Sequence, residues 1–160
     1  MVSTGMGSGS GADEAFDRFV NRVEPRLRAA LVALRGPEDG RDAVAEALMY
    51  AWEHWAEVEL MQNPAGFLYR VGQSKSRRRR RALVPLRTRS DDAPRFEPGL
   101  DPALAKLSET QRSAVVLVHG FEWTYQEVAD ALGVSRSSVG THVSRGMARL
   151  RDELEVVQGA

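Results

Sequence analysis

The chain of 160 residues contains no cysteine. Disulfide bonds and cysteine-ligated zinc are therefore excluded, and three scattered histidines offer little to a metal ion, so we expect no metal site. No apolar run approaches the roughly 20 residues of a membrane span, and we expect a cytoplasmic protein without membrane insertion. A phosphate-cradling glycine loop and a nucleophile paired with a histidine are also missing. We therefore expect no enzyme, no catalytic residue and no cofactor.

The net charge is zero, but the charges are distributed unevenly. Nine basic residues and no acidic residue lie between Arg70 and Arg89, which leaves 13 basic and 22 acidic residues in the rest of the chain. A segment this one-sided attracts anions such as the phosphates of a nucleic acid. A solvated, disordered run of charge fits the same residues, so composition leaves both interpretations open.

Apolar residues recur at helical spacing, and no segment alternates in the way of a strand. Pro25 should kink or interrupt the first helix, because proline lacks the amide hydrogen that a helix interior needs. A third helix is expected to begin with Asn63 as its N-cap and Pro64 at its first position. The expected inward positions of the first two helices are Phe16, Phe19, Val20, Val23, Leu27, Leu31 and Leu34, and then Val44, Leu48, Trp52 and Trp55.

The periodic pattern stops over residues 83–102, where prolines recur, and it resumes in the last third of the chain. We interpret the interruption as a flexible linker. Ser108 with Gln111, and Thr124 with Glu127, have the spacing of a capping box. Helices are therefore expected to begin at both places.

Residues 124–150 read TYQEVADALGVSRSSVGTHVSRGMARL. Gly133 is placed to end one helix and Ser135 to cap the next, which is the arrangement of a helix-turn-helix whose second helix enters the major groove. No acidic residue lies between Val134 and Arg151, which favours DNA over an ordinary helical hairpin with a polar face. The candidate DNA contacts on the second helix are Arg136, Ser137, Ser138, Gly140, Thr141, Ser144 and Arg145.

The segment LSETQRSAVVLVHGFEWTYQEVADALGVSRSSVGTHVSRGMARLRDEL resembles the fourth conserved region of the sigma-70 family, particularly the extracytoplasmic-function (ECF) group. GRDAVAEALMYAWEHW, followed by NPAGFLYRVGQSKSRRRRR, resembles the second conserved region of the same family. The resemblance implies an all-α fold of two small helical domains, a region-2-like domain of three or four helices and a region-4-like helix-turn-helix domain, joined by the flexible proline-rich linker. The expected divisions are a disordered tail (1–12), the region-2-like domain (13–82), the linker (83–102) and the region-4-like domain (103–157).

The resemblance also implies a sigma factor that binds bacterial core RNA polymerase and directs transcription initiation at promoter DNA, with an anti-sigma factor as a further candidate partner. Asp42 and Glu46 would then bind the polymerase, and the helix-turn-helix would read the distal promoter element. The loop at 57–63 and the helix after it would open and read the proximal element. Phe67 and Tyr69 are the aromatic residues there, and Phe67 is expected to belong to the core. The implied contacts to that element or its phosphates are Asn63, Arg70, Ser74, Lys75, Arg77, Arg78, Arg79, Arg80 and Arg81.

Two alternatives remain open at this point. The stretch SSVGTHVSR also resembles the recognition helix of LuxR-type transcriptional regulators, which bind duplex DNA without polymerase. Ala45, Ser74 and Gly140 depart from the residues that are common in the sigma family. Those departures fit a non-initiating, sigma-like protein that competes for polymerase or for an anti-sigma factor.

Overall fold

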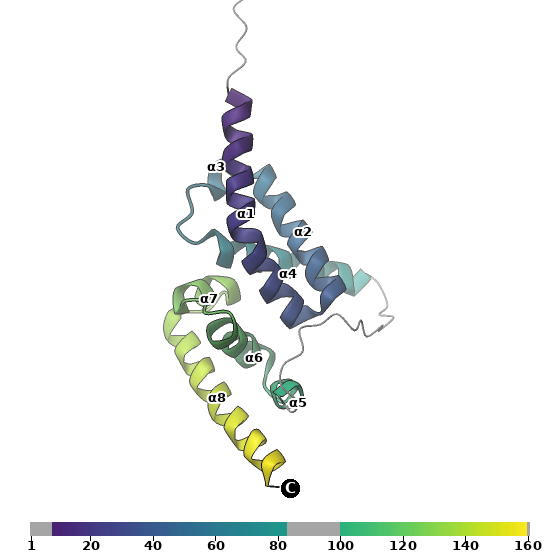
Figure 1. Cartoon of the computed structure of the whole chain (residues 1–160), viewed down its shortest axis with the longest axis vertical. Helices are drawn as coiled ribbons and strands as arrows, with labels where there is room; N and C mark the ends of the chain where they lie inside the picture. The colour runs from purple at the N-terminus through teal and green to yellow at the C-terminus, as the bar shows by residue number, and fades with distance from the viewer. Residues whose placement is uncertain (1–7, 83–99, 160) are drawn as a thin grey trace, which may run out of the picture.

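The computed structural model describes residues 8–82 and 100–159, with side chains from 9–75, 100–156 and residue 159. Every regular element in these ranges is a helix, as predicted (Figure 1). The elements are α1 (Ser8–Arg35), α2 (Pro37–Glu53), α3 (Trp55–Val58), α4 (Pro64–Ala82), α5 (Leu100–Ala105), α6 (Glu109–Val115), the π-helix η1 (Val116–Gly120), α7 (Tyr125–Leu132) and α8 (Arg136–Gln158). No helix among the described residues is long and apolar enough to span a membrane.

Helix α1 runs through Pro25, so of the predicted kink or interruption, the interruption is wrong. Proline removes a single backbone hydrogen bond, whereas the buried face of α1 packs along both α2 and α4 and holds the helix on either side of Pro25. The helix also begins at Ser8, inside the segment expected to be a disordered tail. Extending an existing helix is much less costly than starting one, so residues 8–12 continue the helix that the residues after them form.

Helix α2 buries small residues, and the predicted burial of Trp52 is wrong because its side chain is 54% exposed. A Cβ atom at Gly72 of α4 would lie 2.5 Å from the carbonyl oxygen of Ala43, so the two helices approach closely. Only small side chains, such as Ala47 and Ala51, fit between them. Trp52 lies instead at the edge of the contact between α1 and α2, where its ring meets the Phe16 ring edge-on, with 4.9 Å between the ring centroids.

The helix starts predicted by capping chemistry are confirmed. Asn63 precedes α4, and its side-chain oxygen accepts a hydrogen bond from the Gly66 amide at 3.3 Å. Ser108 and Thr124 each form the complete capping box expected of them. Helix α5 begins at Leu100, near the end of the segment expected to be a linker, and the rest of that segment (83–99) lies outside the described residues.

The two helical regions share one hydrophobic core. Helix α4 packs directly on α7, although the two helices are far apart in the sequence (Figure 1). Tyr69 of α4 is completely buried and meets Trp123 edge-on at 5.7 Å between ring centroids. In this arrangement Tyr69 belongs to the core, so its ring is not presented to unpaired bases.

Candidate nucleic-acid interface

Helices α7 and α8 form the predicted helix-turn-helix. Gly133 ends α7 in the left-handed conformation (φ 67°), which costs glycine little because it has no Cβ atom. Ser135 then caps α8 by accepting a hydrogen bond from the Ser138 amide at 3.1 Å. Val139 and Val143 are buried in the core that both helices share, so they fix which side of α8 faces outward.

The outward face of α8 presents hydroxyl groups and guanidinium groups. Five of the seven predicted contacts are exposed, namely Arg136, Ser137, Thr141, Ser144 and Arg145. Ser138 and Gly140 are half-buried. The Ser138 hydroxyl lies 2.8 Å from that of Ser135, so it takes part in the cap of the helix. The face can therefore offer bidentate guanidinium donors and short hydroxyl donors to bases or phosphates.

Gly140 is not required by packing within this chain. A Cβ atom there would meet only the ring of Tyr125, at an ordinary contact distance of 3.6 Å. Glycine in a helix interior costs about 1 kcal/mol relative to alanine. The fold therefore gives no reason for this glycine.

The predicted proximal-element residues do not form one open surface. The Asn63 amide group donates a hydrogen bond to Asp130 of α7 at 2.9 Å. The exposed Arg70 guanidinium lies beside Gly133, 3.3 Å from where a Cβ atom would stand. Both residues line a cleft of about 650 Å³ between α4 and α7. The surface predicted for the proximal element is thus covered in part by the helix-turn-helix.

Farther along α4, the predicted DNA contacts approach the predicted polymerase contacts. The Lys75 ammonium lies 3.8 Å from the Glu46 carboxylate and over the ring of Tyr50. Ser74 is exposed. Arg77 to Arg81 lie on the helical backbone of α4, but their side chains are outside the described part.

An exposed stripe on α2 extends from the predicted polymerase contact Asp42. Ala45, Met49 and Trp52 follow it at spacings of three, four and three residues, and all four side chains are exposed. Met49 and Trp52 remain 52% and 54% exposed, which is unusual for side chains of this size. Sequence analysis placed Trp52 in the core and did not single out Met49, although both residues have helical spacing from Asp42. We call these four residues the α2 stripe.

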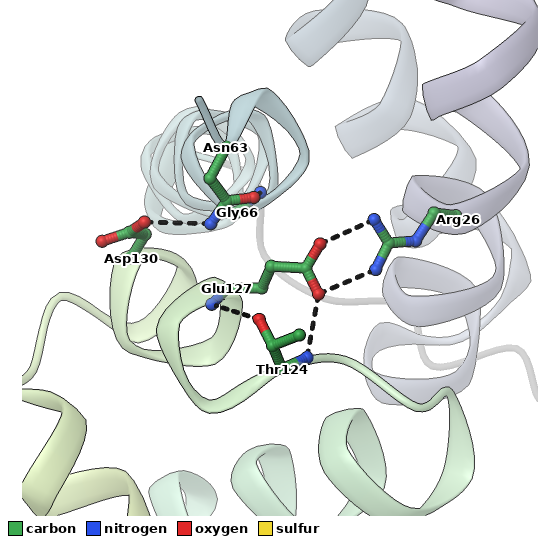
Figure 2. Close-up of polar contacts among 6 residues, drawn as sticks. All are labelled: Arg26, Asn63, Gly66, Thr124, Glu127 and Asp130. Atoms are coloured by element: carbon green, nitrogen blue, oxygen red, sulfur yellow. Dashed lines mark hydrogen bonds and ion pairs between the residues drawn. The ribbon is translucent and has the colours of Figure 1, made fainter. Parts of the chain in front are cut away.

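Among the described residues, polar contacts join the helical regions, and sequence analysis predicted neither of the two described next. The Arg26 guanidinium of α1 donates two hydrogen bonds to the Glu127 carboxylate of α7, at 2.8 and 3.0 Å. The second contact is the Asn63–Asp130 hydrogen bond (Figure 2). We call these two contacts together the clasp. Glu127 also accepts from the Thr124 amide at 2.8 Å, so the same carboxylate caps α7 and pairs with α1.

The Arg26 guanidinium, together with the hydrogen bonds to Thr124, lowers the pKa of Glu127 below its ordinary value of 4.5. The hydrogen bond from Arg26 is the largest cause, and it outweighs the opposing effect of burial. Because the folded-state pKa is the lower one, the ionised carboxylate stabilises the fold above the unfolded-state pKa. This contribution is lost as the pH falls through the folded-state pKa.

We expect Glu127→Gln to lower the free energy of unfolding at pH 7. In strong acid the substitution should leave that free energy almost unchanged. The free energy of unfolding in urea is to be measured for both proteins from about pH 7 down to about pH 2, where the carboxylate becomes protonated. The difference between the proteins should shrink as the pH falls, and Glu155→Gln, at the exposed end of α8, serves as the control. A difference that stays constant with pH would contradict an ionic contribution from Glu127.

Comparison with known proteins identifies the family. Residues 100–150 match the family described as sigma-70, region 4. Over 153 residues the chain is 32% identical to the RNA polymerase sigma-E factor of Streptomyces coelicolor, with 87% of this chain and 85% of the relative covered. The chain belongs to the sigma-70 family. The sigma-E factor of Streptomyces avermitilis is 31% identical over 152 residues, covering 88% of this sigma factor and 85% of that protein.

Solved structures agree with this assignment. CnrH, solved in complex with the cytosolic domain of CnrY, superposes with a TM-score of 0.65 at 25% identity, covering 92% of each chain. The fold also matches the sigma factor RpoE of Bartonella quintana, solved with the anti-sigma factor NepR, with a TM-score of 0.68. That match has 24% identity and covers 89% of this chain and 98% of the other. The predicted ECF group is confirmed by these relatives and neighbours.

Sigma factors bind core RNA polymerase and promoter DNA and regulate transcription initiation, so the predicted function is confirmed at this level. The similarity extends across both helical regions of the chain. The LuxR-type regulator and the non-initiating sigma-like protein are therefore not favoured.

Proposed function

We propose that this sigma factor reads the distal promoter element with the outward face of α8. The observation that carries the proposal is that this face presents Arg136, Ser137, Thr141, Ser144 and Arg145, with no acidic residue between Val134 and Arg151. Arginine can bond guanine or phosphate through two donors, and short hydroxyl side chains allow close approach to the DNA. Ser138 supports the cap of α8 and contributes from the edge of this face.

The proximal element is assigned to the loop before α4 and to α4 itself. Asn63 and Arg70 provide side-chain donors at the start of this surface, and Ser74 and Lys75 continue it toward the arginine run at 77–81. Positive charge along one helix suits the backbone of a separated strand. Leu60, whose side chain is 81% exposed in the loop, adds an apolar group that can pack against an unstacked base.

Polymerase binding is assigned to the α2 stripe together with Glu46. The stripe combines apolar side chains, whose burial by a partner is favourable, with carboxylates that favour a basic partner surface.

We assign the functional divisions to residues 13–82 and 103–157, and we propose that the protein works in the cytoplasm and performs no covalent chemistry. The neighbours solved with NepR and CnrY support an anti-sigma factor as an additional partner.

We expect Trp52→Ala to weaken binding to core RNA polymerase by about five- to tenfold, the loss typical of a moderately important interface side chain. Binding is to be measured by fluorescence anisotropy with purified core enzyme. Leu60→Ala is the matched control, because it removes another exposed apolar side chain away from α2. Equal affinities for the wild type and Trp52→Ala would remove the α2 stripe from the polymerase interface.

We expect Gly140→Ala to stabilise the free protein by up to about 1 kcal/mol while weakening promoter binding. The methyl group meets only Tyr125 within the chain, so the fold gains helix propensity without a clash. On DNA, the same methyl group would stand between α8 and the groove. Thermal unfolding and promoter affinity are to be measured on the same preparation. Greater stability with unchanged affinity would show that no close approach occurs at Gly140.

A further inference from the structure

The outward face of α8 lacks a side chain at Gly140. Ser137 lies three residues before it and Ser144 four residues after it, so these two exposed residues are its neighbours along the helix surface. Among the described residues outside its own turn of helix, a Cβ atom at Gly140 would come within 4 Å of one heavy atom, Cε2 of Tyr125 at 3.6 Å. The chain therefore leaves room for a methyl group beside an aromatic ring and does not fill it.

Tyr125 forms the side of this space. It is the first residue of α7, directly after the cap Thr124, and it is 38% exposed. Val128 of α7 and Val139 of α8 are completely buried in one core, which holds the two helices together at this end. The position of the ring beside Gly140 is therefore set by the packing of the helix-turn-helix.

The chemistry of the space decides what can enter it. A carbon edge of an aromatic ring offers no hydrogen bond to a base, but it packs favourably against another apolar group. Base edges in the major groove present hydrogen-bond donors and acceptors, and the C5 methyl group of thymine is the apolar group among them. A thymine methyl group thus matches this space in both size and polarity.

We propose that the space between Gly140 and the Tyr125 ring, which we call the methyl site, receives the C5 methyl group of one thymine in the distal promoter element. The inference rests on the proposed reading of that element by the outward face of α8. Tyr125, which sequence analysis did not select, then determines specificity from the first helix of the helix-turn-helix. A methyl group added at Gly140 would fill the same space, so the protein methyl group and the DNA methyl group exclude each other.

Replacing thymine with deoxyuridine tests the methyl site, because the replacement removes only the C5 methyl group and leaves base pairing unchanged. The duplex carries a promoter identified by mapping transcript starts. Each thymine of its distal element, on both strands, is replaced in turn, and the affinity of the holoenzyme is measured by fluorescence anisotropy. We expect one position at which the replacement weakens binding by about three- to fivefold, as for the loss of one buried methyl group.

Three variants assign that effect to the methyl site. With Gly140→Ala, the deoxyuridine duplex should bind at least as tightly as the thymine duplex, because the alanine methyl group occupies the site. Tyr125→Ala should remove the preference for thymine, whereas Tyr125→Phe should keep it because the ring remains. Gly120→Ala on η1, which also adds a methyl group with only an ordinary contact within the chain, is the matched control and should keep the preference.

Far-UV circular dichroism checks that each variant is folded. Gly140→Ala meets no clash within the chain, so it tests the proposal even if Tyr125→Ala does not fold. A distal element without thymine would overturn the methyl site. A wild type that no deoxyuridine replacement weakens, or a loss of equal size in Gly140→Ala, would overturn it as well.

A duplex with a scrambled distal element tests the proposed function separately. Equal affinity of the holoenzyme for the correct and the scrambled duplex would remove the reading of this element by α8. Sequence-specific binding without any effect of the thymine methyl group would remove only the methyl site.

Discussion

Replacing Trp123 with alanine is expected to lower the free energy of unfolding by about 3–5 kcal/mol, the range for truncating a buried tryptophan. The side chain is 2% exposed, meets Tyr69 edge-on and lies under the Arg26 guanidinium, so it connects α1, α4 and the start of α7. Typical domains are stable by only about 5–15 kcal/mol, so the variant should lose a large share of its stability. Urea unfolding followed by far-UV circular dichroism measures the loss.

Trp52→Ala provides the matched control for this measurement. Trp52 is the same residue type, but it is 54% exposed, and we expect its truncation to cost about 1 kcal/mol. Similar losses for Trp123 and Trp52 would contradict a core that extends across both helical regions. Because that core is shared, the wild type should also unfold in a single transition when it is followed by different probes.

Arg145→Ala is expected to weaken binding of the holoenzyme to its promoter by about 1–3 kcal/mol, or roughly 5- to 150-fold. Arg145 is exposed on the same face of α8 as Thr141 and Ser144, so its guanidinium can reach a base edge or a phosphate. Binding to core polymerase should not change, because α8 lies in the other helical region from the α2 stripe. Fluorescence anisotropy with a promoter duplex and with core enzyme alone measures the two affinities separately.

The control variant Arg18→Ala removes one exposed positive charge from α1, away from the proposed DNA face. It allows the general effect of charge to be subtracted. A duplex with a scrambled distal element then separates base reading from phosphate contact, because a base contact weakens only the correct sequence. Promoter affinity that Arg145→Ala leaves unchanged would contradict the assignment of this face.

Features that depend on neighbouring residues could be predicted from the sequence. The capping boxes at Ser108 and Thr124 and the turn at Gly133 each involve residues only a few positions apart. The exposed face of α8 followed from helical periodicity in the same way, once Ser135 had set the start of the helix. Local patterns therefore predicted the all-helical fold and the helix-turn-helix.

Features that depend on how close two helices approach could not be predicted. Trp52 fits an apolar stripe, but the close contact of Gly72 with Ala43 leaves room only for small residues, and Trp52 remains at the surface. Glu127 was expected as a capping residue, and nothing in the local sequence indicates its pairing with Arg26, which is 101 positions away. The contact between the two helical regions could not be predicted for the same reason, because it also joins residues that are far apart in the sequence.

Mapping transcript starts tests the central claim most directly. Core bacterial RNA polymerase is incubated with a pool of genomic promoter fragments, with and without this protein, and the transcript ends are sequenced. We predict new starts that share two upstream motifs at a fixed spacing, and the Arg145→Ala protein should produce fewer of them. If tight binding to core polymerase produced no new starts, a promoter-specific initiation factor would be contradicted.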